Sequence, residues 1–124
     1  MNIQLLNAYL LADDIKKLTA WYEKTFDLVR GLEVEEDYNS IELLYDSKFV
    51  IALTSAEQMG VMPHKLRQNT VIAQFVVSDV TECLERVRMH GGKVLFGPSF
   101  DETGNFHYGG FADIEGNHMW IVQG

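Results

Sequence analysis

The chain has 124 residues, 47% of them hydrophobic and 23% charged, which is the balance of one ordinary globular domain. Its 18 acidic and 10 basic residues give a net charge of −8, which disfavours nucleic acid and anionic membranes as partners. The lone cysteine, Cys83, excludes an internal disulfide scaffold. The N-terminal sequence MNIQLLNAYLLADD also lacks a basic region and a cleavage site, so we expect a cytoplasmic protein.

A first strand and helix are expected near the N-terminus. The apolar run Leu5 to Leu11 predicts a strand, and apolar residues then recur at helical spacing from Ile15 to Phe26. Either Asp13 or Asp14 is a natural N-cap for this helix, because a short carboxylate accepts hydrogen bonds from the first turn. Three further strands are predicted after the helix: Val29 to Glu35, Ser40 to Tyr45 and Phe49 to Thr54.

The same pattern returns about 65 residues later, which indicates an internal repeat. Val71 to Val77 predicts a strand, Ser78 and Asp79 supply the cap, and a helix pattern begins at Val80. Gly91 and Gly92 can adopt the positive φ that ends a helix. Three strands again follow: Lys93 to Phe96, Phe106 to Ala112 and His118 to Gln123.

The repeat predicts an α+β fold with a single domain over residues 1–124. It consists of two tandem βαβββ units that form a curved, cup-like mixed sheet with the helices on the outside. The first unit spans residues 1–56 and the second spans 70–124. Residues 57–69, within the mixed-polarity stretch Ser55 to Asn69, are the expected linker.

Several short motifs occur in an order that resembles one known family. They are ADDIKKLTAWYEKTF near the start, with Asp14 ahead of Trp21-Tyr22; Gly97-Pro98; and FADIEGNHMWIVQ at the end, with the turn Asp113-Ile114-Glu115-Gly116-Asn117. Over essentially its whole length the chain is similar to the glyoxalase/bleomycin resistance protein/dioxygenase, or vicinal oxygen chelate, superfamily. The turn has a structural reading without any family, since Gly116 or Asn117 can hold a positive φ between two strands.

The resemblance implies that, in metal-dependent members of the family, each of four strands supplies one ligand to a metal ion. This ion polarises the substrate. Those four positions fall on Asn7, Ala52, Ile72 and Trp120. Asparagine offers one weak carbonyl oxygen, alanine and isoleucine offer nothing, and indole is only a donor. We therefore expect no metal and no cofactor in this chain.

The same positions, with an indole, two aliphatic groups and an amide, favour a flat or apolar ligand in the cup. The predicted ligand-binding residues are Asn7, Tyr45, Ala52, Ile72, His107 and Trp120, and Tyr108 could add to the wall. The alternative is that Trp120 and Ile72 fill the cup as core. No catalytic residue is assigned, although His107 or Glu42 could serve as a general base. His118 should share the face of Trp120, because strand residues two apart point the same way.

The leading hypothesis is therefore a metal-independent protein of this family that binds a small organic ligand, a drug or a metabolite. The acidic net charge would suit a cationic ligand. One alternative is a lyase, isomerase or dioxygenase of the family with a non-standard site, so enzymatic activity is left open. Another is an accessory interaction protein with a filled cup. The resemblance also implies a homodimer.

Overall fold

The computed structural model describes residues 1–3, 8–31, 40–60 and 71–124. The chain divides into two compact units, one made of Met1–Glu23 with Asp27–Pro63 and the other of Lys24–Phe26 with His64–Gly124. The last turn of the first helix therefore belongs with the second unit. Within the described ranges, no helix is long and apolar enough to cross a membrane.

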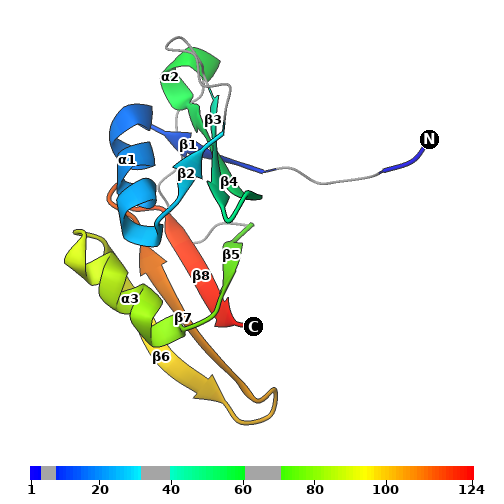
Figure 1. Cartoon of the computed structure of the whole chain (residues 1–124), viewed down its shortest axis with the longest axis vertical. Coiled ribbons are helices and arrows are strands. Elements are labelled where there is room, and N and C mark those ends of the chain that lie inside the picture. Colours follow the sequence, from blue (N-terminus) through cyan, green and yellow to red (C-terminus); the bar gives the residue numbers. More distant parts are fainter. Residues whose placement is uncertain (4–7, 32–39, 61–70) are drawn as a thin grey trace. The chain divides into compact units, whose positions relative to one another are not determined.

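Each unit contains a four-stranded mixed sheet with the same strand order (Figure 1). The first unit contains β1 (Tyr9–Ala12), α1 (Ile15–Phe26), β2 (Val29–Arg30), β3 (Ser40–Tyr45), β4 (Lys48–Ser55) and α2 (Ala56–Met59). The second contains β5 (Ala73–Val77), α3 (Val80–Met89), β6 (Lys93–Asp101), β7 (Phe106–Ala112) and β8 (His118–Gln123). The sheet orders are β1-β4-β3-β2 and β5-β8-β7-β6, and in each sheet the first strand runs parallel to the last. The α+β class and the two βαβββ units are confirmed, whereas the pairing of the two sheets into one cup stays a prediction.

The predicted N-caps are confirmed at equivalent points of the two units. The backbone N–H of Lys17 donates to the Asp14 carboxylate at 3.1 Å, and that of Glu82 donates to the Asp79 carboxylate at 3.0 Å. These bonds satisfy N–H groups that a helix start leaves unpaired. Helix α3 ends where the glycine pair predicted it, with Gly91 at a φ of 87°.

The core of the second unit lies between α3 and one face of its sheet. Val80 and Leu84 are fully or almost fully buried, and the two side chains crowd Gly109 of β7. A Cβ atom at Gly109 would lie 3.0 Å from Leu84 Cδ1, so glycine allows the helix to approach the strand closely. Phe111, also fully buried, lies on the same face of β7.

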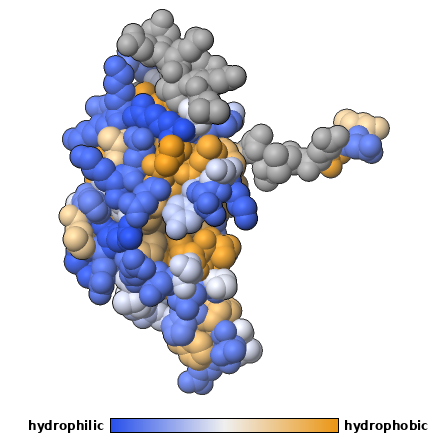
Figure 2. Space-filling model, viewed as in Figure 1, coloured by the Kyte–Doolittle hydropathy of each residue, from blue (hydrophilic) through white to orange (hydrophobic). Residues whose placement is uncertain are grey.

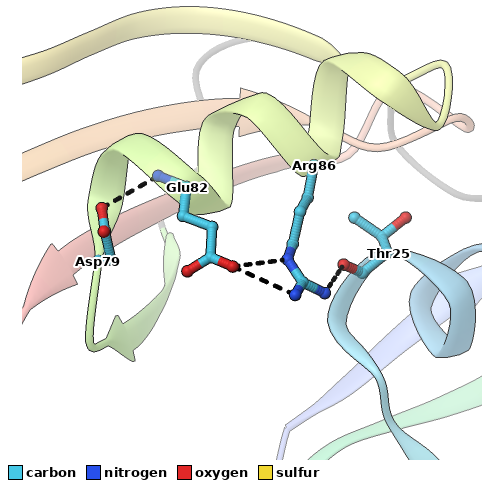
Figure 3. A network of polar contacts seen from close by, with 4 residues as sticks. All are labelled: Thr25, Asp79, Glu82 and Arg86. Carbon is cyan, nitrogen blue, oxygen red and sulfur yellow. Dashed lines mark hydrogen bonds and ion pairs between the residues drawn. The ribbon is translucent and has the colours of Figure 1, made fainter.

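Arg86, in the last turn of α3, also bonds to the last turn of α1 (Figure 3). The Arg86 guanidinium forms an ion pair with Glu82 at 3.2 Å and donates to the Thr25 carbonyl at 3.3 Å. A cation at the C-terminal end of a helix is favoured, because the last carbonyls there carry partial negative charge. Phe26 packs nearby on Phe111, with ring centroids 5.7 Å apart.

Several elements differ from the sequence-based expectation. Strand β6 continues to Asp101 instead of ending at Phe96, and its register shifts twice, between Val94 and Phe96 and between Phe96 and Ser99. A Cβ atom at Gly97 would lie 2.8 Å from both Gly109 Cα and the Tyr108 carbonyl, so a glycine at a φ of 88° is what lets the strand stay paired there. Helix α2 occupies part of the expected linker, with Ser55 as its N-cap. The predicted strands Leu5 to Leu11 and Val29 to Glu35 lie partly outside the described residues. Within the described residues, they correspond to β1 and β2.

Candidate functional site

The two faces of the second sheet have different surroundings. Odd-numbered residues of β7, such as Gly109, point toward α3, and even-numbered ones point to the opposite side. A Cβ atom at Gly110 would collide with the ring of Phe96, which places that ring on the side away from α3. We call this side, which carries Gly110, Phe96, Tyr108 and Trp120, the open face.

A row of four residues crosses the centre of the open face. Strand register aligns Gln74 of β5 with Trp120 of β8, Trp120 with Gly110 of β7, and Gly110 with Phe96 of β6. Trp120 is 47% exposed and Phe96 is 39% exposed, and their ring centroids lie 6.5 Å apart in an edge-on arrangement. Because Gly110 has no side chain, the Phe96 ring can lie over the strand next to the indole.

Further aromatic rings extend this surface toward the tip of the β6–β7 hairpin. Tyr108 lies 6.2 Å from Phe96 and 5.9 Å from Phe106, between ring centroids. Val76 and Val122 align with Tyr108 in the next row of the sheet. Figure 2 shows apolar surface over β5 and over this hairpin, among hydrophilic surroundings. The open face therefore combines exposed aromatic rings with small aliphatic groups.

The structure places three of the predicted site residues around this sheet. Trp120 lies on the open face, and His118 shares that face, as predicted. Ile72 is half-buried and lies just before β5, two residues ahead of Gln74. His107 is exposed on the opposite face, where its ring lies 4.8 Å from that of Phe100. The second sheet therefore does not bring His107 together with Trp120.

The other predicted residues belong to the first unit. Register places Ala52 of β4 between Tyr9 of β1 and Glu42 of β3, and Ala52 is only 3% exposed. Glu42 is exposed, which fits the solvent-facing residue of a strand as well as a base. Tyr45 is exposed at the end of β3, beside the turn to β4. The predicted ligand residue Asn7 lies outside the described residues.

Sequence reasoning missed Phe96, Gln74 and Gly110 as neighbours of Trp120. Three separate strands supply them, and only strand register brings them into one row. One signal was available, since two glycines in the middle of an apolar strand indicate a close approach by another group. Gly109 admits Leu84 on one face, and Gly110 admits Phe96 on the other.

The donor chemistry at the family's metal positions does not fit a metal. Ala52 and Ile72 carry no donor atom, and the indole of Trp120 has no lone pair to offer. Among the residues that the structure describes, no group of three His, Cys, Asp or Glu side chains is placed to hold a metal ion. No step of a metal-assisted reaction is therefore assigned to these residues.

Cys83 does not supply a nucleophile in the second unit. It is buried on α3, and burial raises the pKa of its thiol from 9.0 to about 12. Thiolate is the reactive form, so this thiol is unreactive at neutral pH. Cys83 is therefore a packed residue of the core.

Comparisons with known proteins agree with the architecture. A family model described as the Glyoxalase/Bleomycin resistance protein/Dioxygenase superfamily matches residues 4–121. Among curated proteins, none matches the sequence. A hypothetical protein from S. aureus has a similar solved structure, with a TM-score of 0.75 and 16% identity, over 100% of this chain and 96% of that one.

Two similar structures carry more informative descriptions. One is a glyoxalase/bleomycin resistance protein/dioxygenase family enzyme from Burkholderia phytofirmans, with a TM-score of 0.70 and 15% identity over 94% of this chain and 95% of that one. The other is a fosfomycin resistance protein from Listeria monocytogenes, with a TM-score of 0.71 and 16% identity over 100% of this chain and 95% of that one. At such identities the likeness shows the fold alone, whereas the family model spans almost the whole sequence. The chain belongs to the Glyoxalase/Bleomycin resistance protein/Dioxygenase superfamily.

Proposed function

We propose that this protein binds a small, flat organic molecule on the open face of its second sheet and needs no metal to do so. One observation carries the proposal. At the position that carries the last-strand ligand in metal-dependent members, Trp120 presents a half-exposed indole with the edge of Phe96 beside it. A large aromatic side chain that is left half-exposed on a sheet is the feature that a stacking ligand would cover.

The energy available from this surface suits a small ligand. Covering roughly 100 Å² of apolar area would contribute about 2.5 kcal/mol, and a well-placed aromatic pair adds about 0.5–1.5 kcal/mol. These two contributions together, about 3–4 kcal/mol, correspond to weak binding in the millimolar range. The side-chain amide of Gln74, next to Trp120 in the row, can supply one orienting hydrogen bond.

The exposure of Trp120 also bears on the alternative that the site is filled by its own side chains. A core tryptophan would be almost completely buried, as Trp21 is at 6% exposure. The fosfomycin resistance protein among the structural relatives is named for a small organic antibiotic, which is consistent with a ligand of this size.

The indole N–H resonances offer a direct test, because the chain has two tryptophans in different settings. Trp21 is buried against Tyr22, and Trp120 is half-exposed. A library of flat organic molecules would be screened by ¹H–¹⁵N NMR, with the two indole signals assigned through the Trp21→Phe variant. Binders should shift the Trp120 signal and leave the Trp21 signal in place. Binders that shift only Trp21, or a broad library with no binder, would contradict the proposal.

Metal independence needs its own measurement. The purified protein would be incubated with Ni²⁺, Zn²⁺, Mn²⁺ or Fe²⁺, desalted, and analysed by native mass spectrometry. We expect no stoichiometric metal and an unchanged affinity for any binder in the presence of chelator. A metal that is bound one per chain and is required for ligand binding would overturn this part of the proposal.

We also propose that the protein is a cytoplasmic homodimer, as the family resemblance implies. Size-exclusion chromatography with light scattering checks the assembly. A mass of twice the 14.1 kDa chain is expected, and a mass of one chain at micromolar concentration would contradict it.

A further inference from the structure

Four aromatic side chains form a continuous line along the open face. In order they are Trp120, Phe96, Tyr108 and Phe106, with neighbouring ring centroids 6.5, 6.2 and 5.9 Å apart. The planes of neighbouring rings are inclined to one another by 83°, 53° and 58°. A flat ligand can stack on only one of two rings that are so inclined. The line therefore offers more aromatic surface than one flat ring can use.

A positive group can use inclined rings, because it is attracted to the face of any aromatic ring whose centroid lies within about 6 Å. Half the centroid spacing between Tyr108 and either Phe96 or Phe106 is about 3 Å. An ion about 4 Å above the midpoint of such a pair would lie roughly 5 Å from both centroids, which is inside that range. Tyr108, with a ring on each side, is therefore well placed to receive a cation.

The two rings that flank Tyr108 lie against glycines. A Cβ atom at Gly110 would collide with the Phe96 ring, and one at Gly104 would collide with the Phe106 ring. Each glycine thus lets a ring lie close to the backbone. Side chains that are already packed lose little further freedom when a ligand binds. The surroundings of Tyr108 are therefore largely formed before any ligand arrives.

A carboxylate lies beside Tyr108 on this face. Asp101 is the cross-strand partner of Phe106 and hence a diagonal neighbour of Tyr108, and such neighbours lie roughly 7–8 Å apart. One oxygen of Asp101 accepts from the Gly104 N–H at 3.0 Å, and the other has no hydrogen-bond partner among the described residues. From residue 94 to residue 124 the sequence has four carboxylates and no lysine or arginine; the carboxylates are Asp101, Glu102, Asp113 and Glu115. The charge near Tyr108 is therefore negative.

The basic side chains of the open face lie at its other end. Lys93 and His118 flank Ala112, next to the turn that carries Glu115. Four residues of β7 separate Ala112 from Tyr108, which is roughly 14 Å and beyond the screening length of about 8 Å at physiological salt. Within the part of the chain that the structure describes, Lys93 contacts none of the four rings. These groups therefore do not oppose a cation at Tyr108.

We propose that the ligand of the open face is an organic cation, an ammonium compound that also carries a flat apolar group. The positive group would lie over Tyr108 beside Asp101, and the flat group would cover Phe96 and Trp120. This inference rests on the proposed function, because it names the class of molecule that the aromatic face binds. The net charge of −8 adds a long-range attraction of the same sign.

A pair of probes with one shape and different charge tests the inference: choline and 3,3-dimethyl-1-butanol. Their dissociation constants would be measured by NMR titration at the backbone amide of Tyr108. We expect choline to bind about five-fold more tightly or better, because only choline gains the cation–π attraction. Benzyltrimethylammonium, which adds a flat ring, should bind more tightly than choline and shift the Trp120 indole signal as well. Benzyl alcohol, a ring without charge, should shift the Trp120 signal alone.

Variants locate the positive group. Tyr108→Leu keeps an apolar side chain but removes the ring, so it should abolish most of the preference for choline. Asp101→Asn keeps an acceptor for the Gly104 N–H and should reduce the preference by a smaller factor. Phe100→Leu is the matched control, because Phe100 is 47% exposed on the opposite face of the same strand, and it should change neither affinity. Unchanged ¹H–¹⁵N spectra of the free variants would show that each variant is folded.

The outcomes separate the two proposals. If benzyl alcohol shifts the Trp120 signal but choline binds no better than 3,3-dimethyl-1-butanol, the aromatic site stands and the cationic class is wrong. A preference for choline that survives Tyr108→Leu also refutes the position over Tyr108. If choline binds at Tyr108 while benzyl alcohol leaves Trp120 unchanged at tens of millimolar, the cation is supported and the flat-ring site fails. If no probe binds at such concentrations, both proposals fail for ligands of this type.

Discussion

The two sheets have the same strand order, but the side chains in their central rows differ in size and in exposure. In the first sheet, Ala52 is flanked by Tyr9 and Glu42, and its methyl group is almost completely covered. In the second sheet, the equivalent strand carries Trp120, flanked by Gly110, and the indole is half-exposed. A repeated backbone therefore does not imply a repeated site, because cross-strand partners decide whether a given position is covered or presented to a ligand.

The turns that precede β4 and β8 differ as well. The largest loss of stability is expected when the turn before β8 is disrupted. The β3–β4 connection is short, with Asp46 and Ser47 both at positive φ. The β7–β8 turn is organised by the buried Asp113 carboxylate. We expect Asp113→Ala to lower the free energy of unfolding by about 2–4 kcal/mol, because it leaves the part-buried N–H groups of Glu115 and Asn117 without their acceptor. Asp46→Gly, at an exposed residue already in the left-handed region, should cost less than about 0.5 kcal/mol. Urea denaturation checks both, and similar losses would show that the two turns are held in the same way.

Exchanging the residues of the central rows should change the stability of the protein by unequal amounts in the two sheets. Ala52→Trp places an indole where a methyl group is already covered, so a loss of about 1–3 kcal/mol of stability is expected from overpacking. Trp120→Ala removes a half-exposed ring and should cost less than about 1 kcal/mol, while it weakens ligand binding about ten-fold or more. Thermal and urea unfolding of both variants would measure the difference. A Trp120→Ala variant that loses as much stability as a core mutant would mean that Trp120 is structural.

The two long helices differ at equivalent positions after their caps. Leu84 fills the core of the second unit, whereas α1 has Thr19 at the corresponding place. Thr19 is fully buried, and its hydroxyl has no hydrogen-bond partner among the residues that the structure describes. An unpaired buried hydroxyl is costly, so Thr19→Val should raise the free energy of unfolding by about 1 kcal/mol. Thr81→Val, at an exposed position of α3, is the matched control and should have almost no effect. A loss of stability in Thr19→Val would show that the hydroxyl has a partner after all.

The smallest effect is expected at Cys83, which corresponds to Leu18 of α1. Burial raises the pKa of its thiol to about 12, so the folded protein should resist labelling by a thiol reagent at pH 8 and react only after unfolding in urea. Below about pH 9 both states keep the proton and stability is unaffected. Between about pH 9 and pH 12 the unfolded state loses its proton first, so stability should fall as pH rises. Cys83→Ala should reduce this slope, and rapid labelling of the folded protein would contradict the prediction.

Much of the fold could be predicted from local patterns. The caps at Asp14 and Asp79, the end of α3 at Gly91 and the strand Ser40–Tyr45 all agree with the structure. The face shared by His118 and Trp120 also follows from two-residue periodicity. Strand β6 was harder to predict, since a Gly-Pro pair normally interrupts a strand. The strand can continue at Gly97 because any side chain at this position would collide with the backbone of β7, and glycine has none.

The sequence by itself determined the class of fold, the repeat, the helix ends and the absence of donor atoms at three of the family's metal positions. These features depend on the chemistry of single residues or on spacings within one helix or strand, which a linear pattern contains. Only the tertiary structure decided that Phe96, Gly110 and Gln74 surround Trp120, and that Asp101 shares a face with Tyr108. Those neighbours come from strands far apart in the chain, and their alignment depends on register and on the bulges of β6, which no local pattern specifies.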